Sequence, residues 1–141
     1  MQITIYKGHT KPLTYYELLG SLSRKYQEVI HSRIKYISEN RRWLPELPYA
    51  LDLKRSETSM FEFRIPIDDE NLVRIHYFID RSNNALVILN CYIKPDGIKN
   101  PNSYNKANRR EIESEIESNI QEAIRLKWLY PHNQNDYDIL N

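Results

Sequence analysis

The stretch "FEFRIPIDDENLVRIHYFID", from Phe61 to Asp80, decides the fold because it holds two alternating segments joined by an acidic turn. Successive side chains of a strand point to opposite faces, so each segment divides into two sets. One set is apolar and contains Phe61, Phe63, Ile65, Ile67, Val73, Ile75, Tyr77 and Ile79. The opposite set carries Glu62, Arg64, Leu72, Arg74, His76 and Phe78. The pattern predicts a β-hairpin with one core face and one face that has its own chemistry.

A third strand, "ALVILNCYIK" (residues 85–94), follows a second turn at 81–84. Strict alternation places four of its residues on the apolar face: Val87, Leu89, Cys91 and Ile93. It places the others on the polar face: Leu86, Ile88, Asn90, Tyr92 and Lys94. An antiparallel meander is therefore expected, with Arg, His, Asn, Tyr and Lys side chains on its second face.

The rest of the chain predicts an α+β domain that spans residues 1–141. Residues 2–6 alternate like an opening strand, and the sequence Thr14 to Glu17 is a capping box that starts a helix. After a break at 20–23, a second helix runs to about Asn40 with an apolar stripe that covers the sheet. A last helix is expected from about Ser103 to Lys127, followed by a loosely ordered polar tail at about 131–141.

Composition narrows the possible functions. The net charge is +1, but residues 1–110 hold 18 basic and 12 acidic side chains, whereas residues 111–141 hold 2 and 7. A basic body suits an anionic partner. The apolar runs are too short to cross a bilayer and no signal segment opens the chain, so we expect a cytoplasmic protein. Cys91 is expected to be a buried hydrophobe, and neither zinc-ligand spacing nor a glycine-rich phosphate loop indicates a metal or cofactor.

Several segments resemble one known family when they are taken in order. They are "ELLGSLSRKYQEVIHSRIKYISEN" (17–40), "LPYALDLK" (47–54), "FEFRI" (61–65), "VRIHYFI" (73–79) and "VILNCYIK", with "KNP" and a helix start after it. Over roughly Leu18 to Arg110 the chain resembles the RelE/ParE toxin superfamily, and within it the phage-derived HigB-like branch. It differs from the family pattern in having Pro95 in place of a second lysine and a long acidic helix after Arg110.

The resemblance implies a RelE-like fold, in which an N-terminal strand and a helix hairpin pack on a three-to-four-stranded antiparallel sheet and a C-terminal helix follows. It also implies the toxin of a type II toxin–antitoxin system. Family members of the RelE type cleave mRNA in the ribosomal A site without a metal. The expected partners are therefore mRNA, the ribosome and a cognate antitoxin of the helix-turn-helix type, with no membrane and no cofactor.

Such cleavage needs a proton acceptor, a cation for the phosphorane charge and a donor to the leaving oxygen. In that mechanism Arg64 and Arg74 would hold the phosphate, since guanidinium groups bind it bidentately. Lys94 would stabilise charge, and His76 has the side chain suited to proton transfer near neutral pH. The expected RNA-binding residues are Lys54, Lys99, Tyr92 and Tyr104, of which a tyrosine can stack on a base.

Four of these residues also have a purely structural interpretation. Arg64 can pair with Glu62 or with a carboxylate of the last helix, His76 can be a solvated strand residue, and Tyr92 can pack beneath the last helix. Lys99 can be an ordinary surface lysine. Two further functions therefore stay open beside the mRNA endonuclease: a ParE-like inhibitor of DNA gyrase, and a toxin-fold binding module without activity.

Overall fold

The computed structural model describes residues 1–40, 50–53, 59–68, 70–95 and 109–140. Lys54, Lys99 and Tyr104 lie outside these ranges. The helices are α1 (Tyr15–Gly20), α2 (Arg24–Glu39) and α3 (Arg109–Leu129), and two 3₁₀ turns, η2 (Tyr130–His132) and η3 (Gln134–Asp136), follow α3. The strands are β1 (Gln2–Tyr6), β2 (Ala50–Asp52), β3 (Phe61–Pro66), β4 (Asn71–Asp80), β5 (Ala85–Pro95) and β6 (Tyr137–Leu140).

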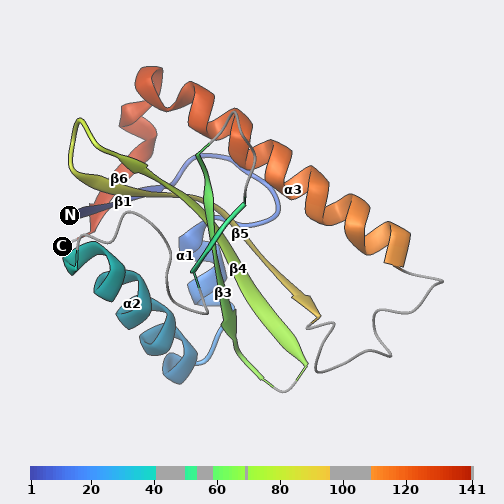
Figure 1. The fold of residues 1–141 in the computed structure, drawn as a ribbon. Helices are drawn as coiled ribbons and strands as arrows, with labels where there is room; N and C mark the ends of the chain where they lie inside the picture. The colour runs from blue at the N-terminus through green and yellow to red at the C-terminus, as the bar shows by residue number, and fades with distance from the viewer. Residues whose placement is uncertain (41–49, 54–58, 69, 96–108, 141) are drawn as a thin grey trace.

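One six-stranded sheet, in the order β2-β3-β4-β5-β1-β6, forms the centre of the molecule. Helices α1 and α2 lie on one side of it and α3 lies on the other (Figure 1). The α+β class and the meander β3-β4-β5 are confirmed. The expectation of three to four antiparallel strands is wrong, because the sheet is wider and β1 pairs with β5 in parallel.

The C-terminal segment is also ordered, contrary to the expected polar tail. Residues 137–140 form β6, which pairs antiparallel with β1 from Tyr6–Tyr137 to Ile3–Leu140. The side chain of Asp138 receives a hydrogen bond from Tyr16 Oη (3.1 Å) and a salt bridge from Lys7 (2.9 Å). The alternating pattern of these residues is short and lies among polar ones, which hides the strand in the sequence.

The predicted helix hairpin is confirmed in detail. Thr14 Oγ1 accepts a hydrogen bond from the backbone N–H of Glu17 (3.1 Å), and Glu17 Oε1 accepts one from the N–H of Thr14 (2.9 Å). These two bonds satisfy backbone donors that the first helical turn leaves without partners. The predicted stripe of α2 faces the sheet, with Ile30, Ile34 and Ile37 fully buried.

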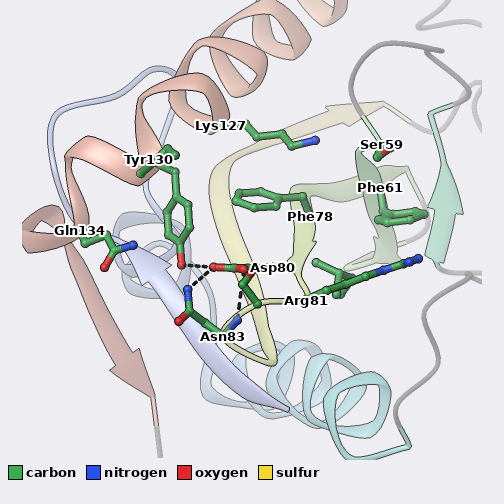
Figure 2. A pocket seen from close by; sticks show the side chains of 12 residues that line it. Ser59, Phe61, Phe78, Asp80, Arg81, Asn83, Lys127, Tyr130 and Gln134 are labelled. Carbon is green, nitrogen blue, oxygen red and sulfur yellow. Dashed lines mark hydrogen bonds between the residues drawn. The ribbon is translucent and has the colours of Figure 1, made fainter.

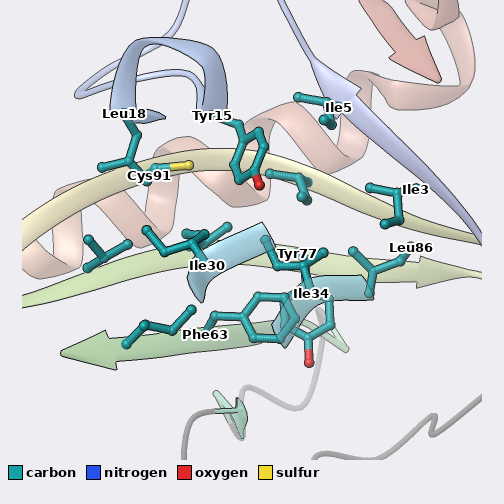
Figure 3. Packing of buried hydrophobic residues seen from close by; sticks show 14 of the residues in the cluster. Ile3, Ile5, Tyr15, Leu18, Ile30, Ile34, Phe63, Tyr77, Leu86 and Cys91 are labelled. Atoms are coloured by element: carbon teal, nitrogen blue, oxygen red, sulfur yellow. The ribbon is translucent and has the colours of Figure 1, made fainter. Parts of the chain in front are cut away.

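The main core lies between these helices and the sheet (Figure 3). It contains the predicted apolar sets of β3 and β4, including Phe63 stacked on Tyr77 with ring centroids 4.2 Å apart. Cys91 is fully buried in it, as predicted. Burial of Cys91 raises the pKa of its thiol.

The face assignment of β5 is wrong for its first half. Ile75 pairs with Cys91, but Tyr77 pairs with Ile88, so two residues of β5 lie opposite the single residue His76. This β-bulge shifts the alternation by one position. As a result Leu86 and Ile88 join the core beneath α1 and α2, whereas Val87 and Leu89 face the opposite side.

A second, smaller core lies beneath α3. It is formed by Ala123 and Leu126 of α3, by the β5 residues that the bulge turns towards them, and by Phe78 and Tyr130. The predicted apolar line of α3 is therefore buried at Ile120 and Ala123, and Ile112 and Ile116 are only half-buried. None of the helices in the described part of the chain is long and apolar enough to cross a membrane.

Candidate functional site

The polar side chains of the meander lie in rows across the strands, on the side of α3. Arg64 of β3 is the direct partner of Arg74 of β4, and Arg74 is the direct partner of Tyr92 of β5. In the neighbouring row Glu62 lies opposite His76. The hairpin register thus brings together three of the four predicted catalytic residues, and adds a carboxylate.

Glu62 is the centre of this group. Its Oε1 is 2.7 Å from Nε of Arg64 and 3.5 Å from Nη1 of Arg74, and its Oε2 is 3.0 Å from Nε2 of His76. The sequence suggested Glu62 only as a partner of Arg64, and that pairing is confirmed. We call Glu62, Arg64, Arg74, His76 and Asn90 the Glu62 cluster.

The Glu62 side chain is fully buried, yet it is ionised. Burial by itself would raise the pKa of the Glu62 carboxyl, but the hydrogen bonds and charges of His76 and Arg64 lower it to about 2. A buried carboxylate is stable only when it is paired and hydrogen-bonded in this way. The carboxylate therefore fixes the two arginines relative to each other.

His76 links Glu62 to the helix above. Asn90 Nδ2 donates to the carbonyl oxygens of Lys11 (3.1 Å) and Asn119 (2.9 Å), which places Asn90 Oδ1 2.8 Å from Nδ1 of His76. Oδ1 can only accept, so Nδ1 of His76 donates. Nε2, on the other side of the ring, faces Oε2 of Glu62 at 3.0 Å, so both ring nitrogens have a partner within the protein.

The interpretation of His76 as a solvated strand residue is wrong, because its side chain is fully buried. Both ring nitrogens are occupied within the protein, so His76 as placed has no nitrogen left for a bound RNA. Its position indicates a structural role: it holds Glu62, and through Asn90 it contacts α3.

The arginines reach solvent to different extents. The Arg64 side chain is 38 % exposed and that of Arg74 is 11 % exposed. Helix α3 covers part of the polar face, which leaves Arg64 more accessible than Arg74. Tyr92, at 2 % exposure, packs beside His76 with ring centroids 5.4 Å apart, so its ring as placed is not available to stack on a base.

Lys94, the fourth predicted catalytic residue, lies one row further along the sheet, opposite Leu72. Its ammonium group contacts the carboxylate of Glu115 in α3, and its side chain is 16 % exposed. Burial and the positive charge of Arg74 lower the pKa of Lys94, whereas Glu111 raises it. Lys94 and Tyr92 line a cleft of about 700 Å³ between β5, α3 and residues 11–13.

Sequence reasoning missed the importance of two residues. The signal for Glu62 was present: a turn at 68–71 pairs residue 64 with 74 and therefore residue 62 with 76. Alternation placed Asn90 correctly on the polar face, but it gave no signal for the hydrogen bonds of Asn90 to Lys11 and Asn119, because these partners lie far away in the sequence. Among the described residues, no group of three or more His, Cys, Asp and Glu side chains is arranged to hold a metal ion.

The chain was compared with protein-family models, curated proteins and solved structures, and no relative was found. No protein-family model matches the chain, and no curated protein or solved structure matches it significantly.

Proposed function

We propose that this chain is the toxin of a type II toxin–antitoxin system, related to the RelE/ParE toxins, and that it cleaves mRNA on the ribosome without a metal. The observation that carries the proposal is the pair Arg64 and Arg74, which lie side by side on adjacent strands and share one carboxylate. The resemblance of the sequence to this superfamily supplies the biological setting.

The charge balance of the pair suits a phosphate. Two like charges directly opposite each other in a sheet are destabilising. Glu62 compensates for one of the two guanidinium charges, and the partly exposed edge of Arg64 and Arg74 remains positive. A phosphodiester is a favoured partner for such planar donors, which bind two of its oxygens at once.

Lys94 is the best-placed group for proton transfer, given the burial of His76. Its pKa is lowered by burial and by Arg74, and it borders the cleft. A lysine with a lowered pKa can accept the proton of the attacking 2′-hydroxyl, or stabilise the phosphorane charge when it is protonated. Glu115 must then give up its contact with Lys94 when RNA binds.

The same face suits an antitoxin. Helix α3 already places acidic side chains near the basic residues, and Glu115 on Lys94 is one such contact. An acidic segment of a partner can bind there in the same way, either over α3 or in its place. Such a complex should weaken as salt rises, because screening acts most strongly on partly exposed charges.

A second function is favoured by one specific observation. The burial of His76 removes the expected proton-transfer group, which suits a module that binds an anionic partner without cleaving it. In this case Arg64 and Arg74 still bind phosphate, but RNA stays intact.

Primer extension on cellular mRNA after brief induction tests these functions. We expect new mRNA 5′ ends with the wild type, and a loss of about 10²–10³ in cleavage rate with Arg74→Ala, as for removal of one donor to a transition-state oxyanion. Arg74→Lys should recover little, since an ammonium cannot reproduce the planar fork. The control is Arg24→Ala, whose side chain is 90 % exposed on α2. Thermal unfolding of each variant confirms that the fold is retained.

Other outcomes select other functions. Growth arrest with DNA damage and intact mRNA identifies a gyrase inhibitor. RNA binding that depends on Arg74, without new 5′ ends, identifies the binding module. Cleavage by Arg74→Ala at the wild-type rate, at equal expression, overturns the role of this arginine pair.

A further inference from the structure

A groove runs along α3, between this helix and the segment of residues 9–13. It begins with the cleft of about 700 Å³ that Tyr92 and Lys94 line. A smaller cleft of about 270 Å³ adjoins it, since the two clefts share the lining residues Lys11, Ser118 and Asn119. The smaller cleft extends to Arg125, and from Glu115 to Arg125 an α-helix rises about 15 Å. We call the two clefts together the α3 groove.

The floor of the α3 groove joins its two walls. Asn90 of β5 donates from one amide nitrogen to the carbonyl oxygens of Lys11 on one wall and Asn119 on the other. Further along the helix, Thr10 Oγ1 donates to Oε2 of Glu122 (2.7 Å). Because Asn90 belongs to the Glu62 cluster, both walls are held in a fixed position relative to that cluster.

The C-terminal end of α3 is anchored separately. Tyr130, directly after the helix, donates a hydrogen bond from Oη to Oδ2 of Asp80 (2.8 Å), at the end of β4 (Figure 2). The Tyr130 ring meets the Phe78 ring edge to face, with centroids 5.2 Å apart. Burial and the hydrogen bond to Asp80 raise the pKa of Tyr130 to about 12, so the phenol stays neutral and donates. A ligand of the α3 groove therefore meets a wall that is already in place, which lowers the entropy cost of binding.

The charges of the α3 groove leave one cation over. Glu115 contacts the ammonium group of Lys94. Glu122 accepts hydrogen bonds from Nε and Nη2 of Arg125 (2.6 and 3.0 Å). Lys11 is exposed, and its ammonium group pairs with no carboxylate among the described residues. The net charge of the groove is therefore positive, and it is centred on Lys11.

The uncharged lining of the groove is of two kinds. Pro12, Leu13 and Ile93 give the larger cleft an apolar wall. Ser118 and Asn119, which line both clefts, use their side chains in no hydrogen bond with another described residue. The groove thus offers a cation, an apolar surface and polar groups side by side.

We infer that the α3 groove binds single-stranded RNA, next to the phosphate that Arg64 and Arg74 hold. The inference rests on the proposed function, because Tyr92 at the start of the groove is the direct partner of Arg74 in the sheet. A neighbouring phosphate of the same strand lies at Lys11, and a base packs on the apolar wall. A length of about 15 Å corresponds to about four nucleotides at the stacked spacing of ~3.4 Å. An acidic peptide of the same charge has no flat ring for this wall.

Binding of an oligonucleotide that cannot be cleaved tests the inference on the full chain. The probe is a fluorescent oligoribonucleotide of about eight nucleotides, whose 2′-fluoro groups cannot attack a phosphate. Lys11→Gln should raise its Kd at least about fivefold at low salt, and should reduce the slope of log Kd against log salt by about 0.7, as for one lost phosphate contact. The matched control is Lys35→Gln, which removes a 58 % exposed ammonium from α2 and should change the Kd less than about twofold.

A second pair of variants probes the α3 wall. Ser118→Glu places a negative charge inside the groove and should raise the Kd at least about tenfold, because it repels the phosphates. Ser114→Glu adds the same charge one turn earlier on α3, at an exposed position that lines neither cleft, and should change the Kd less than about twofold. Thermal unfolding of each variant confirms that the fold is retained.

Two results overturn the inference. One is that Lys11→Gln and Ser118→Glu both bind the oligonucleotide as tightly as the wild type. The other is that an oligoglutamate peptide of the same net charge binds as tightly as the oligonucleotide, which assigns the groove to an acidic protein segment. Cleavage of mRNA is measured separately. Cleavage that depends on Arg74, with unchanged binding by the groove variants, refutes the groove alone; weakened binding by these variants, with no cleavage by the wild type, refutes the proposed cleavage alone.

Discussion

The buried carboxylate of Glu62 makes a quantitative prediction about acid stability. Its pKa is about 2 in the folded protein, against an ordinary value of 4.5. Because the pKa of Glu62 is lower in the folded than in the unfolded protein, the ionised carboxylate stabilises the fold. This stabilisation is fully present above about pH 4.5 and is lost as pH falls towards 2. The difference corresponds to about 3 kcal/mol in the free energy of unfolding, of which about 2 kcal/mol is lost by pH 3.

Substitution of Glu62 by Gln isolates this contribution, because the amide keeps the size of the side chain and does not titrate. Urea unfolding of both proteins at pH 7, 5, 4 and 3 gives the difference between their unfolding free energies at each pH. We expect the unfolding free energy of the wild type, relative to that of Glu62→Gln, to fall by about 2 kcal/mol between pH 7 and pH 3. Other carboxyls titrate equally in both proteins, so their effects cancel.

The matched control is Glu28→Gln, which removes an exposed carboxylate paired with Arg24 at 3.2 Å on α2. Exposed ion pairs contribute little to stability, so the unfolding free energy of this variant should stay within about 1 kcal/mol of the wild-type value. A wild-type advantage over Glu62→Gln that is the same at pH 7 and pH 3 refutes the reasoning, since Glu62 would then have no lowered pKa.

Three further predictions concern the cores and the contact between sheet and helix. Ile75→Asp should unfold the domain, because it places an unpaired charge in the main core; a soluble variant with a cooperative thermal transition would show that the face assignment is inverted. Cys91, whose pKa is raised by burial, should not react with a thiol reagent at pH 8 until urea unfolds the chain, and fast reaction in the native state contradicts its placement. Asn90→Leu removes three hydrogen bonds, so it should lower the free energy of unfolding by about 2–5 kcal/mol and speed amide hydrogen exchange in α3 around Asn119. Unchanged exchange there would show that Asn90 does not hold α3.

The fold could be predicted from the sequence wherever one local pattern was sufficient. The capping box at Thr14 determined the start of α1, and the acidic turn at 68–71 determined which residues of β3 and β4 are opposite each other. These features depend on neighbours in the chain, so alternation and turn chemistry are enough to find them.

Features that depend on distant segments could not be found in this way. The bulge opposite His76 carries no distinctive residue, and it reverses the faces of Val87 and Leu89. The parallel pairing of β1 with β5 joins segments that are far apart in the sequence, and the strand β6 depends on packing between the two ends of the described chain. For the site, strand alternation placed Arg64, Arg74 and His76 on one face of the sheet, but the burial of His76 depends on where α3 lies.

The position of β1 between β5 and β6 has a consequence for biosynthesis. Tyr6 pairs with Tyr137, a residue 131 positions later in the chain. At a synthesis rate of about 5–20 residues per second, β1 must wait roughly 7–26 s for this partner to be translated. Until then β1 has at least one unpaired edge, which is a template for pairing with other strands. The nascent chain is therefore most exposed to misassociation before β6 emerges, and a chaperone that covers β1 during this interval would raise the yield of folded protein.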